Sequence, residues 1–101
     1  MGGVLFPHFD VGQGVCEIGV WLAPGTEGRG VARRALEPLL QWAFERGVVR
    51  VEWQAAPGNV RSIALAERLG FRHEGVLRQS AVVDGVRQDT ALLALLAADR
   101  A

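Results

Sequence analysis

The stretch VEWQAAPGNVRSIALAERLGF, residues 51–71, decides how this chain folds. Its first part is rich in Val and Trp and predicts a β-strand, which Pro57 and Gly58 break. Asn59 is a favoured N-cap residue, and a stripe at helical spacing follows it, made of Ser62, Leu65, Ala66 and Leu69. Gly70 before Phe71 is typical of a helix stop. The stretch therefore predicts a strand and then a helix that turns Ser62 toward the protein interior.

A second helix is predicted upstream of this strand. Between Gly30 and Gly47, apolar residues recur at helical spacing, although Pro38 inside the run predicts a kink. Before that helix, Val15–Leu22 alternates as an interior strand does, and a glycine-rich loop ends it. Since a strand over Val48–Ala55 follows the helix directly, we expect a β-α-β unit with two parallel strands.

Two hairpins complete the predicted sheet. Val4–Phe9 and Val15–Leu22 flank a glycine-bearing loop at residues 10–14, and Pro7 predicts that the first of these strands is an edge strand or contains a bulge. Gly75–Val83 and Val86–Leu96 flank Asp84-Gly85, which is a strong hairpin signal. The elements together predict one α/β (α+β) domain with a mixed sheet.

The composition excludes several function classes. We expect the 101 residues to be a single domain or part of one. The 11 basic and 11 acidic residues cancel, so no overall field favours nucleic acid or an anionic membrane. The basic residues are all Arg, which excludes P-loop and Schiff-base lysines. One cysteine and two histidines predict neither a disulfide nor a metal site, and no leader or membrane span is apparent, so we expect a cytoplasmic protein.

A glycine loop lies between the strand Val15–Leu22 and the first helix. It runs Glu27-Gly28-Arg29-Gly30-Val31-Ala32, and the N–H groups of a helix N-terminus next to Arg side chains suit a phosphate. An ordinary tight turn between strand and helix explains the glycines equally well. The loop lacks the lysine of a P-loop and the third glycine of a dinucleotide-binding fingerprint.

These motifs resemble the GCN5-related N-acetyltransferases (GNAT), and within them the RimJ/RimL-like branch. Three segments carry the resemblance. EIGVWLAP at 17–24 is similar to that branch's fourth strand, and GRGVARRALEPLLQWAF at 28–44 is similar to its coenzyme loop and third helix. NVRSIALAERLGF at 59–71 is similar to its NxxSxxxxxxxGF segment. The resemblance implies an acyl-CoA N-acyltransferase fold, a mixed, mostly antiparallel sheet with a central parallel β-α-β unit. It also implies acetyl-CoA as co-substrate and a primary amine, either a protein N-terminus or a small amine, as acceptor.

The resemblance also implies which residues form the site. Residues expected to bind the coenzyme are Leu22, Ala23, Glu27, Gly28, Arg29, Gly30, Val31, Ala32, Asn59 and Ser62. The family pattern places Gln or Arg where Glu27 stands, and a carboxylate there weakens a pyrophosphate site. Asn59 is expected to contact the pantetheine arm, although on residue type alone it is only a helix cap.

The resemblance implies Ser62 as the proton donor to the departing thiolate of coenzyme A, because this chain has no Tyr and carries Ser at position 62 as RimL-type sequences do. Without the resemblance, Ser62 is only a small polar residue in the first helical turn. Glu52 and Glu17 are the expected general bases, with His8 a weaker candidate. Either carboxylate equally suits an ion pair with Arg50, Arg72 or Arg78.

The family domain has a strand, two helices and another strand before the segment that corresponds to Val4, so the chain resembles an N-terminally truncated domain. Without that layer, we expect Trp21, Trp42 and Trp53 to be at risk of exposure unless a homodimer or a partner chain covers them. An alternative function is therefore a non-catalytic half-domain that binds coenzyme A or a partner. A structural fragment that folds only with another chain is a further alternative.

Overall fold

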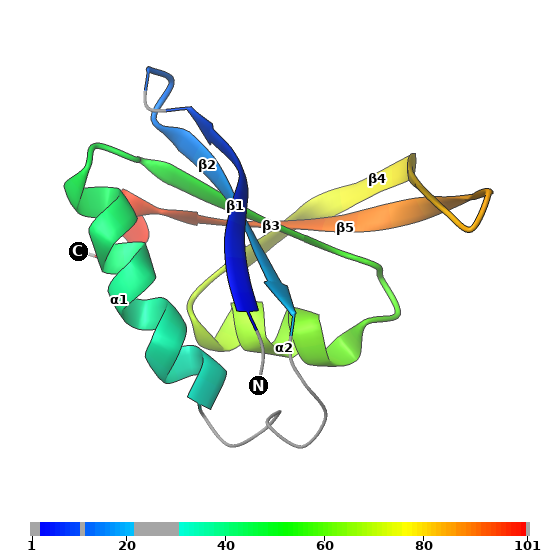
Figure 1. The fold of residues 1–101 in the computed structure, drawn as a ribbon, viewed down its shortest axis with the longest axis horizontal. Helices are drawn as coiled ribbons and strands as arrows, with labels where there is room; N and C mark the ends of the chain where they lie inside the picture. The colour runs from blue at the N-terminus through cyan, green and yellow to red at the C-terminus, as the bar shows by residue number, and fades with distance from the viewer. Residues whose placement is uncertain (1–2, 11, 22–30, 101) are drawn as a thin grey trace.

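The computed structural model describes residues 3–10, 12–21 and 31–100. The elements in chain order are β1 (Gly3–Asp10), β2 (Val15–Trp21), α1 (Val31–Glu45), β3 (Arg50–Ala55), α2 (Val60–Arg68), β4 (Arg72–Val83), β5 (Val86–Leu96) and the short 3-10 helix η1 (Ala97–Arg100). The five strands form one sheet in the order β1-β2-β3-β5-β4 (Figure 1). Among these strands β2 and β3 pair in parallel and the other neighbours are antiparallel, which confirms the predicted β-α-β unit and mixed sheet.

Strand β1 is an edge strand, as Pro7 predicts. Its pairing with β2 shifts register between Leu5 and His8, so a bulge lies where the proline has no N–H to donate. β2 is an interior strand between β1 and β3. The bulge and the edge position are therefore the two features expected of a strand that contains proline.

Both helices pack on the same face of the sheet. The buried core joins one side of the central strands to the apolar stripes of α1 and α2. It contains Cys16, Ile18, Val51, Trp53, Leu93 and Leu95 from the strands, Leu36, Leu40, Ala43, Leu65 and Ala66 from the helices, and Leu69 at the C-cap of α2. Figure 1 shows the far end of the β4–β5 hairpin projecting away from both helices. The opposite face of the sheet carries the alternate side chains of the same strands.

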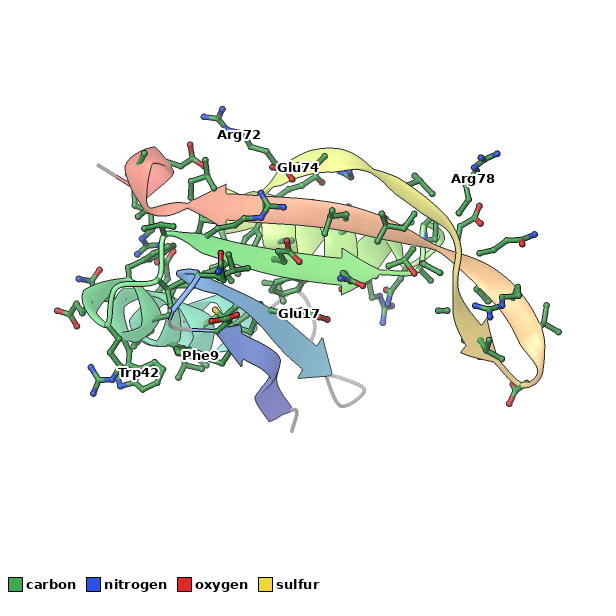
Figure 2. All side chains as sticks on the ribbon, turned by 90° about the horizontal axis from the view of Figure 1, so that it is seen from above. Phe9, Glu17, Trp42, Arg72, Glu74 and Arg78 are labelled. Carbon is green, nitrogen blue, oxygen red and sulfur yellow. The ribbon has the colours of Figure 1, made fainter. Side chains whose placement is uncertain are left out.

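The expected exposure of the tryptophans is confirmed for Trp42 and wrong for Trp53. Trp53 is 2% exposed, so the prediction that it risks exposure is wrong, because α2 and Phe71 cover it. Trp42 on α1 is 39% exposed, with the Arg46 guanidinium 4.4 Å from the centre of its ring and the Phe9 ring 5.8 Å away (Figure 2). The Trp21 side chain lies outside what the structure describes.

Three strands begin at other residues than predicted. β1 begins at Gly3 instead of Val4, because Gly3 already pairs with β2. β3 begins at Arg50 instead of Val48, because the Val48 N–H donates to Ala43 at the end of α1 and the Val49 N–H donates to Gly14 between β1 and β2. β4 begins at Arg72 instead of Gly75, since Arg72 already pairs with β5 and a bulge follows before Gly75. None of the described helices is long and apolar enough to cross a membrane.

Candidate functional site

The parallel strands β2 and β3 stop pairing before either strand ends. Their last pair is Ile18 and Trp53. Beyond it, β2 continues to Trp21 along β1, and β3 continues to Ala55 along β5. Figure 1 shows the two strands diverging there. Residues 19–21 of β2 and 54–55 of β3 are thus not paired with each other. The backbone N–H and C=O groups on these facing strand edges need other hydrogen-bond partners.

The N-terminus of α2 is fixed by Asn59. The Asn59 side-chain oxygen accepts a hydrogen bond from the Ser62 backbone N–H at 3.2 Å, so Asn59 is the N-cap that the sequence predicts. Ser62 lies in the first turn of α2, and its side chain is half-buried. At the other end, Gly70 has φ +98° and the Phe71 N–H donates to the Ala66 carbonyl, which confirms the predicted helix stop.

Ser62 and Trp53 are joined by a hydrogen bond. The Trp53 indole N–H donates to the Ser62 hydroxyl oxygen at 3.0 Å. The indole ring is buried and meets the Phe71 ring edge to face, with 5.3 Å between ring centres and 64° between ring planes. Since Trp53 is the last β3 residue paired with β2, this hydrogen bond connects α2 to the point where the strands diverge.

The two carboxylates predicted as bases lie side by side. Glu17 and Glu52 are register partners on β2 and β3, and each alternates with residues that face the helices, so both lie on the opposite face of the sheet. Trp53 and Ser62 lie on the helix-covered face. The predicted acid and bases are thus on opposite sides of the sheet beside the same divergence.

Arg50 binds two carboxylates, those of Glu52 and Glu74, on the face of the sheet opposite the helices. Its Nε lies 2.9 Å from a Glu52 oxygen, and its two terminal nitrogens lie 2.7 and 3.0 Å from the two oxygens of Glu74. This hydrogen bonding to Arg50 holds the pKa of the Glu74 carboxyl below its usual range, and it raises the pKa of Arg50 in turn. Figure 2 shows Glu74 and Arg72 on the side away from Trp42 of α1. The ion-pair alternative considered for Glu52 is therefore present, with Arg50 as the partner.

The structure brings some of the predicted site residues together and leaves others undescribed. Asn59 and Ser62 share the first turn of α2, and Glu17 and Glu52 are cross-strand neighbours. Val31 and Ala32 begin α1, and their side chains are not described. The remaining predicted coenzyme residues lie outside the described part of the chain: Leu22, Ala23, Glu27, Gly28, Arg29 and Gly30.

Sequence reasoning missed the polar role of Trp53, since it treated this residue only as apolar. A signal was present, because a buried indole N–H needs an acceptor and Ser62 is a polar residue on the face of the next helix that packs on the strand. Within the described residues, no group of three or more His, Cys, Asp and Glu side chains is arranged to hold a metal ion.

The chain matches known proteins along most of its length. The family model of the acetyltransferase (GNAT) domain matches residues 1–72. YdaF of Bacillus subtilis (strain 168), which carries the name of a ribosomal N-acetyltransferase, is 41% identical over 81 residues, 79% of this chain and 44% of YdaF.

Two solved structures share the fold and hold coenzyme. The microcin C7 self-immunity acetyltransferase MccE, in complex with acetyl-CoA and AMP, is 31% identical with a TM-score of 0.87. The match covers 94% of this chain and 53% of the MccE chain. RimJ of Mycobacterium smegmatis, in complex with CoA-disulfide, is 31% identical with a TM-score of 0.87. The match covers 97% of this chain and 48% of the RimJ chain.

This chain thus spans about half the length of these relatives. The family model covers well over half of the chain, and the fold agrees with that of solved acetyltransferases. The chain belongs to the GNAT acetyltransferase domain family.

Proposed function

We propose that this chain forms part of an N-acetyltransferase that binds acetyl-CoA where β2 and β3 diverge and transfers the acetyl group to a primary amine. The observation that carries the proposal is the loss of pairing beyond Ile18 and Trp53, beside the N-terminus of α2. The facing edges of the two strands offer backbone groups to the pantetheine arm and the thioester carbonyl. MccE and RimJ, which share the fold, were solved with acetyl-CoA and CoA-disulfide respectively.

Each end of the coenzyme has a proposed partner in the chain. The loop from Glu27 to Ala32 holds the pyrophosphate with the N–H groups that precede α1, and Leu22 and Ala23 adjoin the pantetheine arm. Asn59 caps α2 through its oxygen, which leaves its amide N–H₂ to contact the pantetheine arm. Ser62, one helical turn further on, lies beside the thioester sulfur.

The proposed reaction is a direct attack in a ternary complex. The lone pair of the neutral amine nitrogen forms a bond with the carbonyl carbon of the thioester, and the C–S bond breaks with its electron pair going to sulfur. The proton lost by the amine passes to a carboxylate or an ordered water, and the departing sulfur takes a proton from the Ser62 hydroxyl, which solvent restores. The products are an acetamide and the free thiol of coenzyme A.

Glu17 and Glu52 are the proposed bases. Their shared face is the one the helices leave open, so an amine approaching from that face meets both carboxylates. Arg50 already donates a hydrogen bond to Glu52, so one oxygen of that carboxylate has a partner before an amine arrives. Separate Glu17→Gln and Glu52→Gln variants identify the base, because the base variant lowers turnover and leaves acetyl-CoA affinity unchanged.

A thiol-release assay tests the proposed activity. The chain is incubated with acetyl-CoA and a panel of small amines and peptides with free N-termini, and thiol formation is measured for the wild type and for Ser62→Ala. We expect turnover with at least one amine and a lower turnover for Ser62→Ala, with acetyl-CoA affinity within a few-fold of wild type. Lost affinity with unchanged turnover of the bound coenzyme contradicts the proton-donor role of Ser62.

The alternative function is a non-catalytic half-domain that binds coenzyme or a partner chain. The ion pair between Arg50 and Glu52 favours it, because it occupies one of the two candidate bases. Binding of acetyl-CoA without thiol release from any amine supports this alternative. Light scattering in the same samples shows whether a homodimer forms.

A further inference from the structure

We propose that Trp53 is a positioning residue for Ser62: its indole N–H fixes the serine hydroxyl so that the hydroxyl proton points to the departing sulfur. This inference rests on the proposed function. The evidence is the 3.0 Å hydrogen bond from Trp53 Nε1 on β3 to Ser62 Oγ on α2, two residues nine positions apart in the sequence.

The indole is held rigidly. Trp53 is 2% exposed, and the edge-to-face contact with Phe71 fixes the plane of its ring. A buried indole N–H is costly to leave without an acceptor, so the N–H stays directed at Ser62 Oγ. The serine oxygen is therefore held at a fixed place relative to the end of the β2–β3 ladder, which is formed by Trp53 itself.

The direction of the hydrogen bond decides what the serine does. An indole N–H donates and never accepts, so it uses a lone pair of Ser62 Oγ and leaves the hydroxyl proton for another acceptor. Among the residues that the structure describes, no group accepts this proton. A bound thioester sulfur is the acceptor that the proposed reaction supplies.

The same hydrogen bond strengthens Ser62 as an acid. An alkyl hydroxyl is a weaker acid than a thiol, so serine gives its proton to a departing thiolate only when negative charge on its oxygen is stabilised. A donated N–H bond grows stronger as the acceptor oxygen becomes charged. Trp53 therefore stabilises the transition state more than the ground state, and its loss lowers kcat more than affinity.

Trp53→Phe tests this role, because phenylalanine keeps a ring against Phe71 and removes the N–H donor. Trp42→Phe is the matched control, since Trp42 lies on α1 beside Phe9, on another element from Ser62. We expect kcat for thiol release to fall about tenfold in Trp53→Phe, with the KM for acetyl-CoA within about twofold, and to stay unchanged in Trp42→Phe.

A double-mutant cycle with Ser62→Ala separates positioning from a structural effect of the smaller ring. If Trp53 acts through Ser62, Trp53→Phe has no further effect on kcat once the hydroxyl is gone. The proposal is overturned if Trp53→Phe has the same kcat as wild type. It is also overturned if Trp53→Phe lowers kcat by the same factor in the wild-type chain and in Ser62→Ala.

The indole resonances give a readout that does not depend on activity. In ¹H–¹⁵N spectra, Ser62→Ala is expected to shift the indole N–H signal of Trp53 and to leave that of Trp42 in place. An unmoved Trp53 signal overturns the proposal even where Trp53→Phe does not fold. Absence of turnover in the wild-type chain overturns the proposed function instead, and Trp53 then has no reaction to serve.

Discussion

Asn59 is expected both to cap α2 and to bind coenzyme, and two substitutions separate these roles. Asn59→Ala removes the cap and the amide. Asn59→Asp keeps an oxygen acceptor for the Ser62 N–H and removes the amide donor, and its negative charge suits a helix N-terminus.

The structure sets the size of the stability change. The capping bond is 3.2 Å long and exposed, so its loss in Asn59→Ala is expected to cost about 0.5–1 kcal/mol, at the lower end of the range for caps. For a domain of about 100 residues, 1 kcal/mol shifts Tm by roughly 4–8 °C, so a fall of roughly 2–8 °C is expected. Asn59→Asp is expected to melt within about 2 °C of wild type, because aspartate and asparagine cap equally well.

Coenzyme affinity distinguishes the two roles. Thermal melting gives Tm, and calorimetric titration with acetyl-CoA gives Kd for each variant. Asn59→Asp is expected to raise Kd about fivefold through loss of one hydrogen bond, without loss of stability. Wild-type affinity in Asn59→Asp refutes the coenzyme contact and leaves Asn59 a cap only, whereas a wild-type Tm in Asn59→Ala refutes the cap.

Three further predictions concern the stability and reactivity of the chain. Because Arg50 lowers the pKa of Glu74, the ion pair stabilises the fold above the ordinary glutamate pKa of about 4.5, and this stabilisation is lost as the pH falls through the lowered pKa. The urea melts of wild type and Glu74→Gln should therefore differ at pH 7 and converge in acid. Gly70→Ala places a side chain at φ +98° and should lower the free energy of unfolding by about 1–2 kcal/mol. Gly58→Ala, with open space at its Cβ and no positive φ, should change the stability little. Equal melting temperatures of the two variants would contradict this. Burial raises the pKa of Cys16 to about 11, so a thiol reagent at pH 8 should label it only on unfolding, and rapid labelling of the native chain would show that the core is open.

Local signals predicted most of the fold correctly because they act over a few residues. Asp84 and Gly85 both adopt positive φ, 52° and 78°, as the hairpin turn requires, and Gly70 ends α2 in the conformation that favours glycine. The starts of β3 and β4 were placed wrongly because tertiary hydrogen bonds and a bulge decide them. Val49, for example, has strand propensity but donates to Gly14, which is far away in sequence.

The candidate site was predicted less completely, since its contacts join distant residues. The cap by Asn59 follows from residue type, and it is present. The hydrogen bond from Trp53 to Ser62 depends on how α2 packs on β3, and the pair of Arg50 with Glu74 spans 24 residues and two strands. Spacing in the sequence does not specify these contacts, because they depend on the register of the sheet and on the position of a helix.

The most direct test of coenzyme binding at the divergence of β2 and β3 is an NMR titration of the ¹⁵N-labelled chain with acetyl-CoA. We expect saturable one-to-one binding, with the largest amide shifts at the unpaired strand edges near Gly19 and Gln54 and in the first turn of α2 at Ser62. A folded chain whose amides do not shift, or whose shifts are confined to the far end of the β4–β5 hairpin near Asp84, would contradict the proposed site.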